Sequence, residues 1–199
     1  MSRPELLLFD LGGVLIDNIA FERLSAIPGI ELDPAEIKSK WLASSTVRSF
    51  ELGAISAETF AQAFVEEWNL PVEPELFLAD FAGWPKGFYP GVPELIHSLR
   101  QQFRVACLGN SNAVHWRWFG SLGGHFDIAL SSHLLGEIKP DSLCFERALQ
   151  ECRANRESVA FFDDSLENVL AARSLGLQSF HVCGIAQVNH VLLQSGWLQ

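Results

Sequence analysis

Three carboxylates stand at positions where apolar runs of the sequence end. Asp10 follows the run Leu6–Phe9, and the pair Asp163 and Asp164 follows the run Val159–Phe162. Paired carboxylates suit Mg²⁺, which prefers oxygen ligands, and a carboxylate can also attack phosphorus to form an aspartyl-phosphate. These residue types therefore favour metal-assisted phosphoryl transfer over other chemistry.

A lysine and a polar turn extend this set. Gly109, Asn110 and Ser111 follow the apolar run Phe103–Leu108, and Lys139 precedes a Pro-Asp pair that would open a helix. A lysine and backbone amides can balance the negative charge of transferring phosphoryl oxygens. Any one of these acids, taken singly, is explained as well by helix capping, but the ordered set favours a functional site.

Five short apolar runs alternate with segments of helical periodicity. This alternation predicts an α/β fold, with a Rossmann-like three-layer core and a mostly parallel sheet of five or more strands. Ligands of such sheets bind beyond the carboxyl ends of the strands, so we expect the polar groups to meet at one edge. The five runs are Leu6–Phe9, Phe103–Leu108, Ile128–Leu130, Val159–Phe162 and Ser179–Cys183.

A long segment with helical patterns separates the first two predicted strands. Asp33 and Ser56 are each placed to cap a helix, and a third helix is predicted over Pro74–Phe81. Trp84–Gly87 is predicted to be a return loop. The expected domains are a core of residues 1–15 and 86–199 and a small helical-bundle cap of residues 16–85.

The composition limits the classes of partner. The 199 residues are 48% hydrophobic and 19% charged, with a formal net charge of −10 and a pI near 5.0. This balance disfavours a nucleic-acid groove or an anionic membrane surface, because both reward clustered Lys and Arg. We expect a monomer or a homodimer that binds a small molecule, neither nucleic acid nor membrane.

Cysteine usage and the N-terminal sequence predict a cytoplasmic protein. No apolar run approaches the roughly 20 residues that span a bilayer, and the first residues lack the basic region of a signal peptide. The cysteines show no metal-binding spacing, and we expect them to be reduced, buried thiols. They are Cys107, Cys144, Cys152 and Cys183.

Four segments, in order, resemble the motifs of the haloacid dehalogenase superfamily. Together they cover essentially the whole chain, and the helical segment after the first motif resembles a small cap of the family's first type. The Asp-Leu-Gly-x-Val form of the first motif, with Gly-x-Ile-Ser in the cap, is similar to the branch of sugar-phosphate phosphatases and epoxide-hydrolase N-terminal domains. The segments are Asp10-Leu11-Gly12-Gly13-Val14-Leu15, Leu108-Gly109-Asn110-Ser111-Asn112, Lys139-Pro140-Asp141 and Asp163-Asp164-Ser165-Leu166-Glu167-Asn168.

The resemblance implies a role for each matching residue. Asp10 would be the nucleophile, and Lys139 would orient it and neutralise the phosphate. Mg²⁺ would be bound by Asp10, by the carbonyl of Gly12 and by Asp164, with Asp163 binding the metal directly or supporting its ligands.

The substrate would be a small phosphorylated metabolite, such as a sugar phosphate. The resemblance implies that Gly109, Asn110 and Ser111 contact its phosphate. Arg48, in the cap, is placed to contact the polar tail of the substrate, although a solvated helix arginine explains it equally well.

Two positions depart from the family pattern. Gly12 stands where phosphatases of the family have an aspartate that acts as general acid and base, and losing such a group removes about 10²–10⁴-fold in rate. Asp17, water or another residue would have to supply the proton. Gly109 stands where a serine or threonine would bind phosphate, which leaves the backbone amides and Ser111 for that purpose.

These departures keep three functions open. The leading one is a Mg²⁺-dependent phosphatase that forms an aspartyl-phosphate. A metal-free dehalogenase is the second, but the adjacent acids Asp163 and Asp164 argue against it because they need a cation to offset their repulsion. The third is a catalytically impaired domain of this family that binds a phosphometabolite or a protein without turnover.

Overall fold

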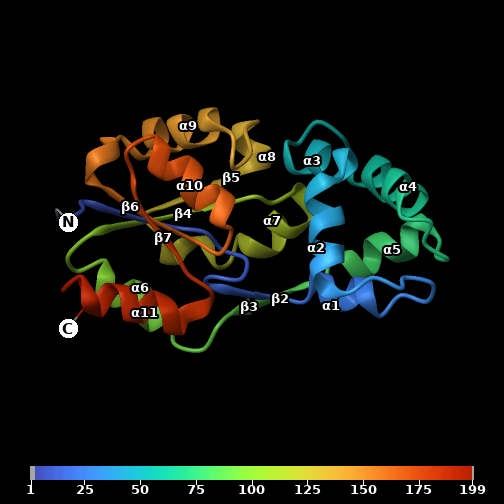
Figure 1. Cartoon of the computed structure of the whole chain (residues 1–199), viewed down its shortest axis with the longest axis horizontal. Helices are drawn as coiled ribbons and strands as arrows, with labels where there is room; N and C mark the ends of the chain where they lie inside the picture. The colour runs from blue at the N-terminus through green and yellow to red at the C-terminus, as the bar shows by residue number, and fades with distance from the viewer. Residues whose placement is uncertain (1–2, 199) are drawn as a thin grey trace.

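The computed structural model describes residues 3–198 (Figure 1). Within this range a five-stranded parallel sheet has the strand order β5-β4-β1-β6-β7. The predicted α/β fold with a parallel sheet is therefore confirmed, and the predicted strands lie within two residues of the observed ones. The strands are β1 (Leu6–Phe9), β4 (Arg104–Gly109), β5 (Ile128–Ser131), β6 (Val159–Asp163) and β7 (Gln178–His181).

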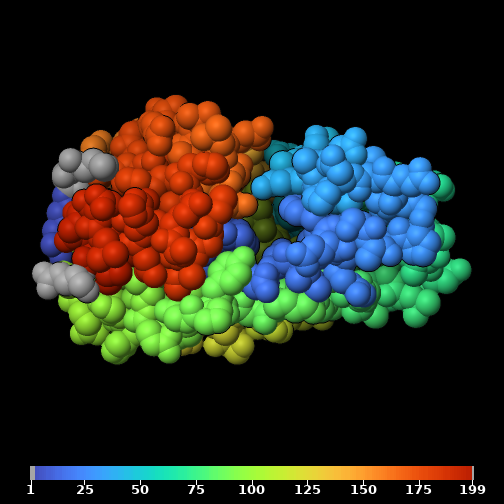
Figure 2. All heavy atoms as spheres, turned by 60° about the horizontal axis from the view of Figure 1, so that its bottom comes forward, coloured from blue at the N-terminus to red at the C-terminus, as the bar shows by residue number. Residues whose placement is uncertain are grey.

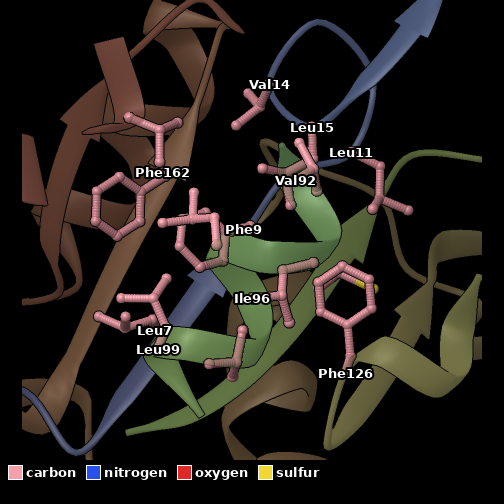
Figure 3. Packing of buried hydrophobic residues seen from close by; sticks show 14 of the residues in the cluster. Leu7, Phe9, Leu11, Val14, Leu15, Val92, Ile96, Leu99, Phe126 and Phe162 are labelled. Carbon is pink, nitrogen blue, oxygen red and sulfur yellow. The ribbon is translucent and has the colours of Figure 1, made fainter. Parts of the chain in front are cut away.

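Helices cover both faces of this sheet, as the continuous hydrophobicity of the strands requires. Successive side chains of β1 point to opposite faces, so Leu7 and Phe9 pack with Val92 and Ile96 of one helix layer (Figure 3). Leu8, on the other face, packs in a second buried cluster with residues of α9 and α10. The helices of this part are α6 (Val92–Leu99), α7 (Ala113–Phe119), α8 (Ser132–Leu135), α9 (Ser142–Cys152), α10 (Leu166–Ser174) and α11 (Gly184–Gln194).

The segment between β2 and β3 forms five helices, named here the helical insert, that lie beside the sheet (Figure 1). Asp33 caps α2 through a capping box, Ser56 caps α4, and α5 spans the predicted residues, so these three predictions are confirmed. The insert has its own buried cluster of aromatic and aliphatic side chains. Its helices are α1 (Ala20–Ser25), α2 (Pro34–Ala43), α3 (Ser45–Glu51), α4 (Ala57–Glu67) and α5 (Pro74–Phe81).

A short antiparallel ribbon joins the helical insert to the sheet. It consists of β2 (Ile16–Asn18) and β3 (Pro85–Phe88), so the prediction of a return loop at Trp84–Gly87 was wrong. Pro85 stands at the first position of its strand, where a missing N–H is tolerated. Pairing with β2, a contact that local sequence does not reveal, makes this segment a strand.

The cysteines follow the prediction with one exception. Cys107, Cys144 and Cys152 are free and buried, whereas Cys183 is free and exposed. The prediction for Cys183 was wrong because β7 ends at His181, and Cys183 stands at the start of α11 instead of inside a strand. Among residues 3–198, no helix combines the length and apolar character needed to cross a membrane.

Candidate active site

A buried lysine joins two of the predicted carboxylates. Lys139 Nζ donates to Asp10 Oδ1 and to Asp163 Oδ2, each at 2.6 Å. Asp10 directly follows β1 and Asp163 ends β6, and these strands are neighbours in the sheet. Lys139 is 3% exposed and Asp163 is fully buried. The sheet therefore brings together the acids that the sequence placed at strand ends.

Asn110 fixes the main chain at Lys139. Its Nδ2 donates to the carbonyl of Lys139 at 2.9 Å, and its Oδ1 accepts from the N–H of Lys139 at 3.0 Å. The side chain of Asn110 thus binds the loop that carries the lysine, whereas the backbone amide of Asn110 was predicted from the sequence to contact phosphate.

Asp163 has further partners at the start of α10. Its carboxylate accepts the N–H of Ser165 at 2.8 Å and the Nδ2 of Asn168 at 3.0 and 3.1 Å. Together with Lys139, these donors fix both oxygens of a fully buried carboxylate. Asn168 lies in the fourth motif, one helical turn after the acidic pair, but no individual role was predicted for it.

Burial dominates the electrostatics of this cluster. It raises the pKa of Asp10 to about 7, opposed by Lys139 and reinforced by Asp163 and Asp164. Burial by itself would lower the pKa of Lys139, but the attraction of Asp10 and Asp163 outweighs it and raises that pKa. Lys139 contacts two of the three carboxylates, and the partly exposed Lys38 approaches Asp164. Three carboxylates against two lysines leave an excess of negative charge that a divalent cation would offset.

The donor set fits a hard divalent cation. Asp10, Asp163 and Asp164 each offer an oxygen within 4.8 Å of the others, and carboxylate oxygens are the ligands that Mg²⁺ prefers. Gly13 makes room for this arrangement, because a Cβ there would lie 3.0 Å from Asp164 Oδ2, and its φ is +73°. The side chain of Asp164 is 28% exposed, so it is open to the cleft in front of it.

The carboxylates lie in a cleft of about 570 Å³ between the sheet and the helical insert. Figure 2 shows the surface hollowed between the orange C-terminal helices and the blue helices of the insert. Both parts of the chain supply its walls, and Lys38 and Glu51 come from the insert. The core residues that line it include Asp10, Gly12, Asn110, Lys139, Asp163 and Asp164.

The other residues predicted to bind phosphate line a smaller hollow beside this cleft. Gly109 and Ser111 contribute to a volume of about 70 Å³, which shares Gly12 and Asn110 with the cleft. A Cβ at Gly109 would lie 3.2 Å from Leu11 Cδ1. The space into which a serine or threonine side chain would point is thus occupied by a leucine.

Arg48 takes a partner in the core instead of lining the cleft. It forms an ion pair with Asp141, next to Lys139, and is not among the described residues that line the cleft. A second pair crosses the same gap, with Lys38 Nζ 3.4 Å from Asp164 Oδ2. Arg48 was predicted to face the substrate and Lys38 was not, because no local pattern shows which face of an insert helix meets the core.

Glu51 is a further acid that the sequence analysis did not assign. It is the last residue of α3, partly buried, and lines the cleft with Asp10. Burial raises its pKa to about 7, with Lys139 and Arg48 opposing and Asp10 adding to the rise. Asp17, considered earlier as a proton donor, is exposed on β2 and is not one of the described cleft residues.

His115 has a packing role in the cleft wall. Its ring stacks on Phe81 at 4.2 Å between centroids, and Nε2 lies 2.8 Å from the carbonyl oxygen of Phe81. Burial lowers its pKa to about 4, so the ring is neutral near pH 7. His115 therefore connects α7 to the helical insert through its contacts with Phe81.

The chain is similar in sequence to known hydrolases. The sequence model of the haloacid dehalogenase-like hydrolases matches residues 4–176. A phosphatase from Mycobacterium tuberculosis is 26% identical over 184 residues, which cover 87% of this chain and 85% of that protein. A D-ribitol-5-phosphate phosphatase from Bacteroides thetaiotaomicron is 24% identical over 188 residues, covering 87% and 89%.

The fold has close counterparts among solved structures. The magnesium complex of a haloacid dehalogenase family enzyme from Bacteroides thetaiotaomicron superimposes with a TM-score of 0.77. The match covers 96% of this chain and 99% of that one at 21% identity, so it shows the fold alone. The family model, in contrast, spans most of the sequence and all four motifs. The resemblance is thereby confirmed: the chain belongs to the haloacid dehalogenase-like hydrolases.

Proposed function

We propose that this hydrolase is a Mg²⁺-dependent phosphatase for a small phosphorylated metabolite, such as a sugar phosphate. The observation that carries the proposal is the cluster of Asp10, Asp163 and Asp164 beside the buried Lys139. A nucleophilic carboxylate, a cation site and a fixed lysine are the groups that phosphoryl transfer requires.

The proposed reaction has two steps at phosphorus. A carboxylate oxygen of Asp10 attacks phosphorus, and the bond from phosphorus to the leaving oxygen breaks. Water then attacks the aspartyl-phosphate, and the bond from phosphorus to Asp10 breaks to release phosphate. Lys139 holds the Asp10 carboxylate through its 2.6 Å hydrogen bond. Mg²⁺, when held by Asp10, Asp163, Asp164 and the carbonyl of Gly12, would neutralise charge on the phosphoryl oxygens.

Other residues are proposed to contact the substrate. Backbone amides of Gly109 and Asn110, with Ser111, would face the phosphate where the smaller hollow meets the cleft. To reach the polar tail of a substrate, Arg48 would have to break its ion pair with Asp141. The helical insert would act as a cap that closes over the cleft and selects the substrate.

The relatives suggest which substrates to test first. Their names include a D-ribitol-5-phosphate phosphatase and a phosphoglycolate phosphatase, the latter from Nitrosococcus oceani. A cleft of about 570 Å³ has room for a substrate of this size. D-ribitol 5-phosphate, phosphoglycolate and p-nitrophenyl phosphate are therefore the proposed first set.

Phosphate release with and without metal tests the proposal. With Mg²⁺ we expect sustained turnover of at least one of these compounds, abolition by excess EDTA and recovery on adding excess Mg²⁺. Phosphate release that continues unchanged in EDTA would exclude the metal-dependent mechanism. No phosphate release, together with halide release from a 2-haloacid in EDTA, would instead favour the metal-free dehalogenase.

A binding domain without turnover is the second candidate. Leu11 occupies the space beside Gly109, and Gly12 lacks a carboxyl group, so two parts of the usual phosphatase site are missing. This function predicts saturable binding of a phosphorylated compound without phosphate release. Sustained release from any compound above trace rate would exclude it.

A further inference from the structure

Position 12 leaves an open space next to the nucleophile. A Cβ built on Gly12 meets only Asn18 Nδ2, at 3.9 Å, among described atoms within 4 Å. Gly12 lies two residues after Asp10 and lines the same cleft. With no carboxyl group at position 12, water or a side chain from another part of the chain would have to protonate the leaving oxygen.

Glu51 lines the same cleft, and its main chain is held by contacts with the core. Its carbonyl accepts the Oγ–H of Ser132 at 2.6 Å, and the same Oγ accepts the N–H of Ser111 at 3.0 Å. Ser132, at the start of α8, thus links the end of α3 to the loop after β4. These hydrogen bonds fix the main chain of Glu51 relative to the loop that follows β4.

The turn that follows Glu51 also requires close contact with the core. Gly53 has φ of +72°, and a Cβ there would lie 2.7 Å from the carbonyl oxygen of His133. Only glycine fits this approach without displacing one of the two main chains. The main chains of the insert and of α8 therefore meet immediately beside Glu51, and this contact points the end of α3 at the cleft.

The charges around Glu51 suit a group that exchanges protons near neutral pH. Asp10 and Lys139 face it from the core, Arg48 lies on its own helix and pairs with Asp141, and His133 lies on α8. Burial and Asp10 raise the pKa of Glu51 to about 7, against the opposing influence of Lys139 and Arg48. A carboxyl group of this kind can both donate and accept a proton at working pH.

We infer that Glu51, supplied by the helical insert, is the general acid and base that replaces the carboxyl group missing at Gly12. As Asp10 attacks phosphorus, the proton of the Glu51 carboxyl passes to the leaving oxygen, which departs as an alcohol. The resulting carboxylate then takes a proton from the water that attacks the aspartyl-phosphate. Each cycle thus restores protonated Glu51 and free Asp10, and the inference rests on the proposed phosphatase function.

Leaving groups of different basicity separate this role from a structural one. Glu51→Gln should lower kcat/KM for D-ribitol 5-phosphate, or for whichever alkyl phosphate the wild-type protein hydrolyses, by about 10²–10⁴-fold. For p-nitrophenyl phosphate, whose leaving group departs as a stable anion, kcat/KM should change by only a few-fold. Equal losses on both substrates, or no loss on the alkyl phosphate, would overturn the inference.

Two variants complete this experiment. Gly12→Asp places a carboxyl group in the open space beside Asp10 and should restore much of the alkyl phosphatase activity lost in Glu51→Gln. Glu67→Gln makes the same change at an exposed position of α4 and should leave both activities unchanged. If the double variant Gly12→Asp with Glu51→Gln is as inactive as Glu51→Gln alone, that result would contradict the role of Glu51 as proton donor.

A stability measurement gives a readout independent of turnover. Because the pKa of Glu51 is raised in the folded state, the wild-type protein loses stability as pH rises from about 4.5 to 7. Glu51→Gln should therefore raise the Tm of the metal-free protein more at pH 8 than at pH 5. An equal change at both pH values would contradict the placement of Glu51. Absence of phosphate release by the wild-type protein from every substrate would instead refute the phosphatase function itself.

Discussion

Two lysines approach the carboxylates of the site from different parts of the molecule. Lys139 comes from the core, is 3% exposed, and lies 2.6 Å from both Asp10 and Asp163. Lys38 comes from the helical insert, and its side chain is 42% exposed at 3.4 Å from Asp164. The charge of Lys139 is shielded from water and is shared between two carboxylates, whereas the ion pair of Lys38 with Asp164 is open to solvent.

The difference separates a fixed part of the site from an adjustable one. Breaking a buried ion pair leaves an uncompensated charge in a medium that solvates it poorly, so such a pair resists change. An exposed pair contributes little and is screened by salt, so it can exchange partners as a substrate enters. We expect the core to hold the reacting carboxylate still, and the helical insert to supply groups that respond to the substrate.

The largest effect is expected for the core carboxylate itself. Asp10→Asn removes the proposed nucleophile and should lower kcat by about 10⁴–10⁶-fold, as for other covalent catalysts. The fold should be retained, because asparagine has the shape of aspartate and Lys139 keeps Asp163 as a partner. Steady-state kinetics and thermal unfolding check both points. Asp17→Asn, on the exposed ribbon, is the control and should keep full activity.

Lys139→Met tests whether the core pair is the rigid one. It leaves Asp10 and Asp163 buried without their cation and should lower the free energy of unfolding by about 3–5 kcal/mol at pH 8. Urea unfolding measures the change. A loss below about 1 kcal/mol would mean that water reaches the carboxylates around Lys139. The ion pairs of Lys139 and Lys38 would then not differ as a buried and an exposed pair should.

Mg²⁺ binding should depend on the ionisation of the core carboxylates. The pKa of Asp10 is raised to about 7 in the folded protein, so the native state binds more protons than the unfolded chain between about pH 4 and 7. The metal-free protein should therefore lose stability as pH rises through this window. Mg²⁺ at a hundred times its Kd should return about 2.7 kcal/mol at pH 8, by mass action. Thermal unfolding with and without Mg²⁺ measures this, and no stabilisation at any concentration would contradict the cation site.

The smallest effect on stability is expected for the insert lysine. Lys38→Met removes an exposed ion pair and should change the free energy of unfolding by less than about 1 kcal/mol. Because Lys38 lines the cleft, we expect a higher KM for anionic substrates with little change in kcat. A loss of unfolding free energy as large as that of Lys139→Met would show that both lysines belong to the fixed part of the site.

The same contrast explains what the sequence could predict. Continuous apolar runs identify buried parallel strands, and their carboxyl ends meet at one edge whatever the details of packing. The convergence of Asp10, Lys139, Asp163 and Asp164 was therefore predictable from spacing and motif order. Their roles as nucleophile and metal ligands stay predictions.

The residues supplied by the insert were not predictable in this way. Capping residues correctly located the starts of α2 and α4, and α5 spans the predicted residues, but neither signal says which helix face meets the core. Glu51 depends on Ser132 and on the close approach of Gly53 to His133, which are contacts between segments far apart in the chain. The strand β3 and the exposure of Cys183 were missed for the same reason, since both depend on tertiary pairing or on where a strand ends.

The stereochemical course at phosphorus tests the central claim most directly, because it does not require an intermediate to accumulate. A substrate whose phosphate is made chiral with oxygen isotopes would be hydrolysed in isotopically distinct water, and the configuration of the released phosphate determined. Two successive in-line displacements, first by Asp10 and then by water, predict retention of configuration. Inversion would show that water attacks the substrate directly and would contradict the assignment of Asp10 as the nucleophile.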